Sequence, residues 1–191
     1  MEGGFALGVS DCKDGEKMGK AEGCSLAMHA NIDIGDIKKF CDDPHHSGAI
    51  TGHIDFTPFG ENIPAKNGVF NLFCPSHDPD MKLMVYELGF EHDGKDYYVA
   101  GKKEVKDDPG FDLWSDTTTL YTTLHEGKDS SGPIIGSGVL RLGVGELIKL
   151  IQSMTAPNAG TLKEKAECVS AFGTFFLGRL WVNYAKMAKK A

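Results

Sequence analysis

The chain has 191 residues, 24 of them glycine, and a formal net charge of -7. This length suits one domain whose core is large enough to need no disulfide or metal support. The acidic balance argues against nucleic acid and anionic membranes as partners, and no apolar run approaches the ~20 residues of a membrane span. The glycines are scattered without a period, which is typical of chains with many tight turns and bulges.

The start of the chain and its cysteines indicate where the protein works. The first residues lack the basic stretch and long apolar stretch of a targeting segment. The five cysteines are odd in number and lack the spacing of a zinc site or redox motif. We therefore expect a cytoplasmic protein with reduced thiols and with no metal, cofactor or membrane span.

The first quarter of the chain predicts few regular elements. Residues 1–24 are rich in glycine and lysine and lack periodicity, so an irregular N-terminal arm is expected there. Apolar and polar residues alternate from Ser25 to Ile34, as in a half-buried strand. Asp36 then suits the cap of a short helix that Asp43-Pro44 ends.

Strand patterns dominate the middle of the chain. Residues from Pro58 to Gly68 have the composition of a loop, and Asp93-Gly94 is typical of a type I′ hairpin turn. A second turn is expected at 107–110 and a third at 127–133. Between these breaks we expect strands at 50–56, 69–73, 82–92, 97–105, 113–125 and 134–144.

The period changes to that of a helix near the C-terminus. Apolar residues favour a short helix at about 146–154 and a long one at about 161–187. Thr161 and Glu164 have the spacing of a capping box at the start of the long helix. The fold class is therefore α+β and mainly β. We expect a single domain over 25–191, a strongly coiled antiparallel meander closed into a calycin- or lipocalin-like barrel, with the long helix packed on it.

Several polar and aromatic side chains are candidates for a site in such a barrel. His53 and Asp55 are two residues apart on a strand, so they share a face and suit a general base or an orienting hydrogen bond. Arg141 suits a carboxylate clamp or an ion pair with Glu87 or Glu104. The remaining ligand-binding candidates are Tyr86, Trp114, Tyr121, His125 and Phe176, of which Phe176 lies on an aromatic helix that could wall a pocket.

Several stretches have a familiar combination of residues: 51–56, 68–73, 84–88 through 107–114, 116–121, 138–143 and 175–181. Together they resemble an uncharacterised bacterial domain that accompanies flavoproteins of the glucose-methanol-choline type, the group that contains cholesterol oxidase-like enzymes. The resemblance covers most of residues 25–184, brings no established catalytic residues, and implies a sterol, lipid or apolar alcohol context. The chain has no nucleotide fingerprint, so any oxidase activity would belong to a partner.

Three functions are compatible with these observations. The leading interpretation is a non-catalytic accessory module that binds a small apolar molecule and serves a flavin oxidoreductase. The first alternative is a small cofactor-free isomerase, cyclase or hydrolase that uses His53, Asp55, Tyr121, His125 and Arg141 in a barrel pocket. The second is a protein-interaction module. An unpaired edge strand would favour a homodimer.

Overall fold

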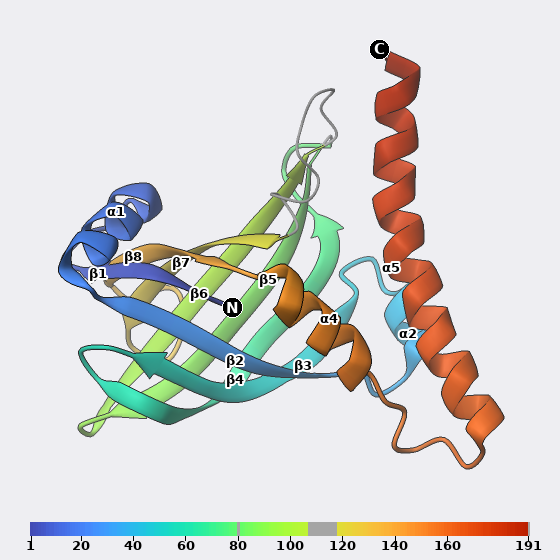
Figure 1. Cartoon of the computed structure of the whole chain (residues 1–191), viewed down its shortest axis with the longest axis horizontal. Coiled ribbons are helices and arrows are strands. Elements are labelled where there is room, and N and C mark those ends of the chain that lie inside the picture. The colour runs from blue at the N-terminus through green and yellow to red at the C-terminus, as the bar shows by residue number, and fades with distance from the viewer. Residues whose placement is uncertain (80, 107–117, 191) are drawn as a thin grey trace.

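The computed structural model describes residues 1–79, 81–106 and 118–190, whose strands form a closed antiparallel β-barrel (Figure 1). Each strand pairs with the next in the chain, and β1 pairs with β8 to close the barrel. The sequence-based prediction of a mainly β fold with a barrel and a long C-terminal helix is confirmed. The strands are β1 (Glu2–Leu7), β2 (Ser25–Asp33), β3 (Ser47–Phe56), β4 (Gly60–Pro75), β5 (Met81–His92), β6 (Lys95–Lys106), β7 (Thr119–Glu126) and β8 (Ile134–Arg141).

The first 24 residues are ordered, so the expected irregular arm is wrong. They form β1, which closes the barrel, and helix α1 (Cys12–Glu22). Asp11 begins α1 by accepting hydrogen bonds from the backbone N–H groups of Lys13 and Asp14, at 2.9 and 3.0 Å. Because β1 pairs with β8, the described strands leave no unpaired edge, which was the condition under which a homodimer would be favoured.

Helix α1 lies on the outside of the barrel against β1 and β8 (Figure 1). Two glycines make its closest approaches to the barrel wall. A Cβ atom at Gly15 would lie 2.2 Å from the Ser137 carbonyl oxygen, and one at Gly19 would lie 2.2 Å from the Phe5 nitrogen. Glycine lowers helix propensity, which explains why this segment has a weak helical signal in the sequence. The close approach of α1 to the barrel wall nevertheless requires glycine at positions 15 and 19.

Strand β4 is longer than the sequence indicates. The loop expected from Pro58 to Gly68 is strand from Gly60 onward. Its turn-like residues mark irregularities within the strand: Asn62 and Asn67 both have a φ of 56°, and the pairing with β5 shifts between Lys66 and Val69. Bulges of this kind bend a strand and help a sheet to close.

The hairpin between β5 and β6 confirms the turn predicted at Asp93-Gly94, where both residues have positive φ angles, 50° and 72°. The two strands pair in an unbroken register from Met81↔Lys106 to His92↔Lys95. The turn expected at 107–110 and the first part of the strand expected at 113–125 lie outside the described residues. The described part of that strand is β7.

One apolar cluster fills the interior of the barrel. Its side chains come from alternate positions along each strand, as the period of a β-strand requires. Gly138 of β8 faces inward, and a Cβ atom there would lie 2.6 Å from Cδ2 of Phe5, its partner on β1. Fully buried members include Phe5, Leu26, Ile54, Phe56, Leu88, Val99, Leu120, Leu124 and Leu140.

The remaining helices lie beside the barrel (Figure 1). They are α2 (Ile37–Asp42), α4 (Val144–Ser153) and α5 (Leu162–Lys190). Asp36 caps α2 as predicted, and Thr161 and Glu164 form the predicted capping box, with bonds of 3.0 and 3.2 Å. No helix in the described part of the chain has the length and apolar character of a membrane span.

Candidate functional site

The structure distributes the predicted site residues over three parts of the molecule. Tyr86 faces the interior of the barrel from β5, and Phe176 lies on α5. Trp114 lies outside the described residues. The others lie on the outer face of the barrel wall in two separate places: His53 and Asp55 lie on β3, whereas Tyr121, His125 and Arg141 lie on the neighbouring strands β7 and β8. Because β2 and β1 lie between β3 and β8 on the shorter way around the barrel, the described residues bring these five polar groups to no common site.

Two of the outer candidates have structural partners that account for them. The ring nitrogens of His125 contact Thr123 Oγ1 at 2.9 Å and the Gly132 carbonyl oxygen at 2.8 Å, so His125 holds the turn between β7 and β8. Arg141 donates to both carboxylate oxygens of Glu16 on α1. The expected partners Glu87 and Glu104 are therefore wrong for Arg141.

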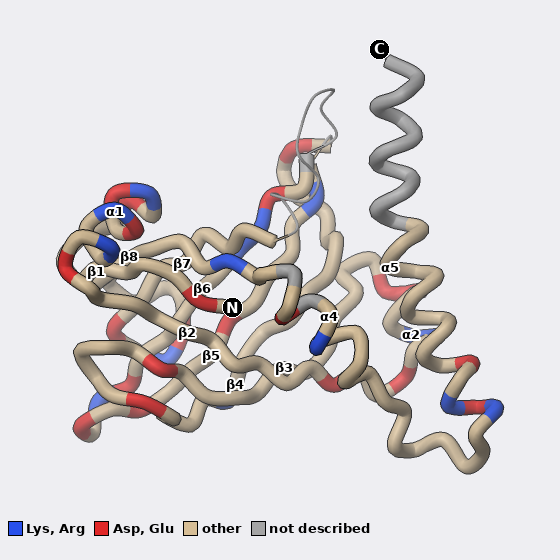
Figure 2. The backbone as a smooth tube through the Cα atoms, in the orientation of Figure 1, with Lys and Arg blue, Asp and Glu red and all other residues tan. Residues whose placement is uncertain are grey.

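Glu16 shows how α1 is tied to the barrel by charge as well as by close packing. Burial opposes its ionisation, but hydrogen bonds from Arg141 and Lys20 outweigh that effect and hold the pKa of the Glu16 carboxyl below its ordinary value. Figure 2 shows that acidic and basic residues are interspersed over α1. This ion pair is consistent with a structural role for Arg141.

Phe176 belongs to an aromatic cluster that joins α5 to α2 and β4. Phe172 and Phe175 of α5 have ring centroids 6.1 and 5.5 Å from that of Phe40 on α2. The ring centroid of Phe176 lies 5.7 Å from that of Phe73 on β4. Aromatic rings at these separations stabilise packing through edge and offset contacts. Phe176 therefore packs α5 against the body of the protein, outside the barrel interior.

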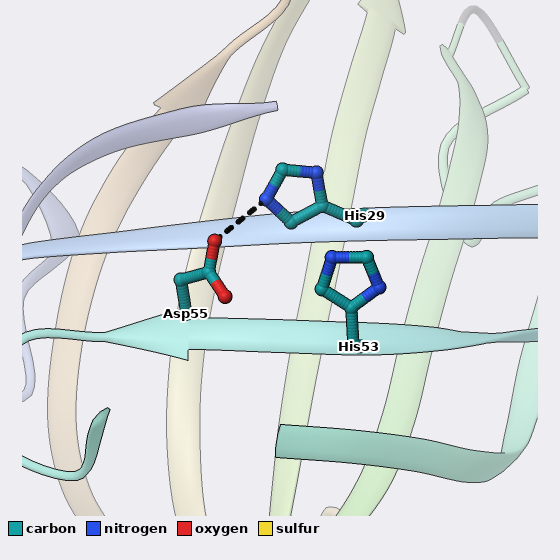
Figure 3. Close-up of side chains that lie close together, drawn as sticks. All are labelled: His29, His53 and Asp55. Carbon is teal, nitrogen blue, oxygen red and sulfur yellow. Dashed lines mark hydrogen bonds and ion pairs between the residues drawn. The ribbon is translucent and has the colours of Figure 1, made fainter. Parts of the chain in front are cut away.

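On the outer face of β2 and β3, His53 and Asp55 are joined by a residue that the sequence analysis did not select. His29 lies directly opposite His53 in the register of the two strands. The two imidazole rings stack with centroids 4.3 Å apart, and His29 Nε2 lies 2.9 Å from Asp55 Oδ2 (Figure 3). The sequence signal for His29 was its place on the polar face of β2, but its pairing partner required the register.

The Asp55 carboxylate is held from two sides. The backbone N–H of Asn62 donates to Oδ1 at 2.6 Å, and His29 contacts Oδ2. The Asn62 bond lowers the pKa of the Asp55 carboxyl below its ordinary value, and the neighbouring His29 and His53 rings lower it further. The carboxylate is thus kept ionised and fixed in orientation beside two imidazoles.

Inside the barrel, Tyr86 has a neighbour that sequence reasoning also missed. Lys103 of β6 faces inward with the alternate residues Tyr97 and Val99 and is only 3% exposed. Its Nζ atom lies 4.9 Å from the centroid of the Tyr86 ring, in the geometry of a cation–π contact. The alternation along β6 would have placed Lys103 inward, but lysine is usually assigned to a solvent face.

Burial governs the ionisation of this pair. Removal from water lowers the pKa of Lys103 to about 7, and it raises the pKa of the Tyr86 hydroxyl above its ordinary value. Both residues therefore tend toward their neutral forms in the apolar interior. An amine that changes its charge near neutral pH, placed inside a barrel beside an aromatic hydroxyl, is a typical feature of a binding or catalytic site.

Comparisons with protein-family models, curated proteins and solved structures found no match to this chain. The interpretation of both sites therefore depends on their own residues. The inner site combines Lys103 and Tyr86 with an apolar surrounding, which suits an amphipathic ligand. The outer site combines two imidazoles and a carboxylate, which suits a cation.

Proposed function

We propose that the barrel is a binding module for a small, mainly apolar molecule that carries an acidic group. The observation that carries this proposal is the side chain of Lys103, which is buried within the apolar barrel against the ring of Tyr86. An ionisable amine in such surroundings is costly to keep and is common at functional sites. An accessory function of this kind requires no catalytic residue.

The chemistry of the pair favours a carboxylate as the polar part of the ligand. A carboxylate next to Lys103 would stabilise the ammonium form and raise the pKa of the amine from about 7 toward its ordinary range. The Tyr86 hydroxyl can donate a hydrogen bond to the same group. A charge-assisted contact in an apolar site is stronger than the same contact in water.

The surrounding side chains suit an apolar ligand body. Met84 lies directly opposite Lys103 in the pairing of β5 and β6, and Phe70 contacts the Tyr86 ring with centroids 5.2 Å apart. Methionine is unbranched and repacks readily around a ligand. A hydrocarbon chain that displaces Met84 would gain the same apolar contacts that now fill the interior.

The family resemblance supports a lipid ligand and a flavin oxidoreductase as the partner that receives it. A fatty acid combines a lipid body with the acidic group that Lys103 favours, so we propose this class ahead of sterols and apolar alcohols. We also propose that the protein works in the cytoplasm, because none of its five cysteines forms a disulfide in the described structure.

Titration with a fluorescent fatty acid, followed by displacement with oleate and with oleyl alcohol, tests this function. We expect oleate to displace the probe more effectively than the alcohol of the same chain length. Lys103→Met should weaken oleate binding about tenfold or more, which corresponds to the loss of one charge-assisted hydrogen bond, and should leave the weak alcohol binding unchanged.

Lys102→Met is the matched control, because Lys102 is the neighbouring lysine on the same strand and points outward. It should bind oleate as the unmodified protein does. Failure of oleate to bind, or equal weakening by the two substitutions, would contradict the proposal. Equal binding of acid and alcohol would contradict the role of Lys103 and leave only an apolar-ligand module.

A further inference from the structure

We propose that His29, His53 and Asp55 form a binding site for a divalent transition metal ion, with Zn²⁺ as the best match, on the outer face of β2 and β3. Within the described residues these three side chains bring their ligand atoms within 4.8 Å of one another. The site lies on the opposite face of the barrel wall from Lys103, so this inference does not depend on the proposed ligand function.

The frame that holds the three side chains is rigid. His29 and His53 are cross-strand partners, and Asp55 follows His53 by two residues, so all three point to the same side of the sheet (Figure 3). The pairing of β2 with β3 is continuous from Leu26↔Phe56 to Asp33↔Ala49. Ligands on paired strands keep their spacing better than ligands on loops, which reduces the entropy lost when a metal binds.

Side-chain rotations complete the coordination geometry, because the two imidazole rings stack with an interplanar angle of 11° and must turn to direct their nitrogens at one ion. A tetrahedral Zn²⁺ ion with bonds of about 2.0–2.2 Å needs ligand atoms roughly 3.3–3.6 Å apart. The His29 Nε2–Asp55 Oδ2 distance of 2.9 Å would open slightly to admit the ion, and the widest separation, up to 4.8 Å, would close by about 1 Å. These changes require only χ rotations of the three side chains, of which His29 is exposed and His53 and Asp55 are half-buried.

The donor set selects the class of metal. Two imidazole nitrogens and one carboxylate oxygen suit Zn²⁺ and neighbouring first-row ions, whereas Ca²⁺ and Mg²⁺ prefer oxygen ligands throughout. Three protein ligands leave a coordination position for water or for a donor from another molecule. The ligand set is therefore that of an open site.

The surroundings favour binding of a cation. The Asn62 backbone N–H holds Asp55 Oδ1, which leaves Oδ2 directed at His29 Nε2, and such outer contacts orient metal ligands. The side chains of His29 and Asp55 are 47% and 33% exposed, so an ion can enter directly from solvent. Without metal, the hydrogen bond between His29 and Asp55 stabilises the same arrangement.

Zn²⁺ titration in competition with a chromophoric chelator tests the site, using reduced protein because the cysteines of the described structure form no disulfide. We expect one Zn²⁺ per chain, bound more than about tenfold more weakly after Asp55→Asn or His29→Ala. Asp55→Asn keeps the side-chain shape and can still accept the Asn62 bond, so it should fold normally. His77→Ala is the matched control, because His77 is an exposed histidine remote in sequence from the site.

A Co²⁺ absorption spectrum separates this site from adventitious binding by thiols, because thiolate ligands give strong near-ultraviolet bands that imidazole and carboxylate do not. We expect visible bands without the thiolate bands, and their loss in Asp55→Asn. The proposal is overturned if Zn²⁺ does not bind, if His77→Ala weakens binding as much as Asp55→Asn, or if the spectrum shows thiolate ligation. In those cases the three side chains form only a surface hydrogen-bonded cluster.

Discussion

The inner and outer faces of the barrel wall carry polar groups of very different character. Lys103, on the inner face, is 3% exposed, and its ionisation is governed by removal from water. His29 and Asp55, on the outer face, are 47% and 33% exposed, and the pKa of Asp55 is governed by its hydrogen bonds. Because successive residues of a strand point to opposite faces, one residue along a strand separates the two environments. Position on the wall therefore decides which chemistry a polar residue can perform.

The largest expected effect comes from removing the inner charge. Lys103→Met should raise the free energy of unfolding at pH 6 by a few kcal/mol, because methionine occupies a similar volume without a buried amine to desolvate. Urea unfolding of both proteins at matched pH measures this difference. Lys102→Met should change the stability by less than about 0.5 kcal/mol, since Lys102 is exposed.

The gain in the free energy of unfolding produced by Lys103→Met should depend on pH between the native and the unfolded pKa of Lys103. In the unfolded chain the lysine keeps its ordinary pKa of 10.5, whereas in the native barrel the pKa is about 7. Between these values the unfolded chain holds a proton that the native chain has lost, so the stability of the unmodified protein rises with pH. The difference in the free energy of unfolding between the two proteins should therefore be largest below pH 7 and shrink toward pH 10.5. A difference that stays constant from pH 6 to pH 10 would contradict the burial of a titrating amine.

A substitution on the outer face of the barrel should change the free energy of unfolding far less than Lys103→Met does. Asp55→Asn removes one exposed hydrogen-bonded ion pair and should cost less than about 1 kcal/mol at neutral pH. Because the native pKa of Asp55 is lowered, its contribution is present above the ordinary carboxyl pKa of 3.8 and is lost as the pH falls through the native value. The midpoint temperatures of thermal unfolding of the two proteins should therefore converge at acidic pH. A loss of several kcal/mol at pH 7 would mean that the cluster is part of the structural core.

The parts of the fold that could be predicted are those with local signals. The Asp93-Gly94 turn and the alternation along β5 and β6 are local, and they predicted the hairpin. Helix α1 was missed because Gly15 and Gly19 weaken its local signal and serve a contact with β1 and β8 that lies far away in the sequence. The extent of β4 was missed because bulge residues have the same composition as turns.

The same distinction between local and distant signals applies to the sites. His53 and Asp55 were selected because their two-residue spacing is visible in the sequence, but His29 joins them only through the register of β2 and β3. Lys103 follows Tyr97 and Val99 in strict alternation, so its direction was readable. The burial of the Lys103 side chain could not be predicted, because the sequence does not show which other residues pack around it inside the barrel.

The central claim is that Lys103 is a buried amine poised to meet an acidic ligand, and its pKa tests this most directly. The ¹³Cε resonance of Lys103, assigned by its loss in Lys103→Met, can be followed against pH with and without oleate. The account predicts a midpoint of about 7 in the free protein and a clear upward shift when oleate binds. A midpoint near the ordinary 10.5, or a midpoint that oleate leaves unchanged, would contradict it.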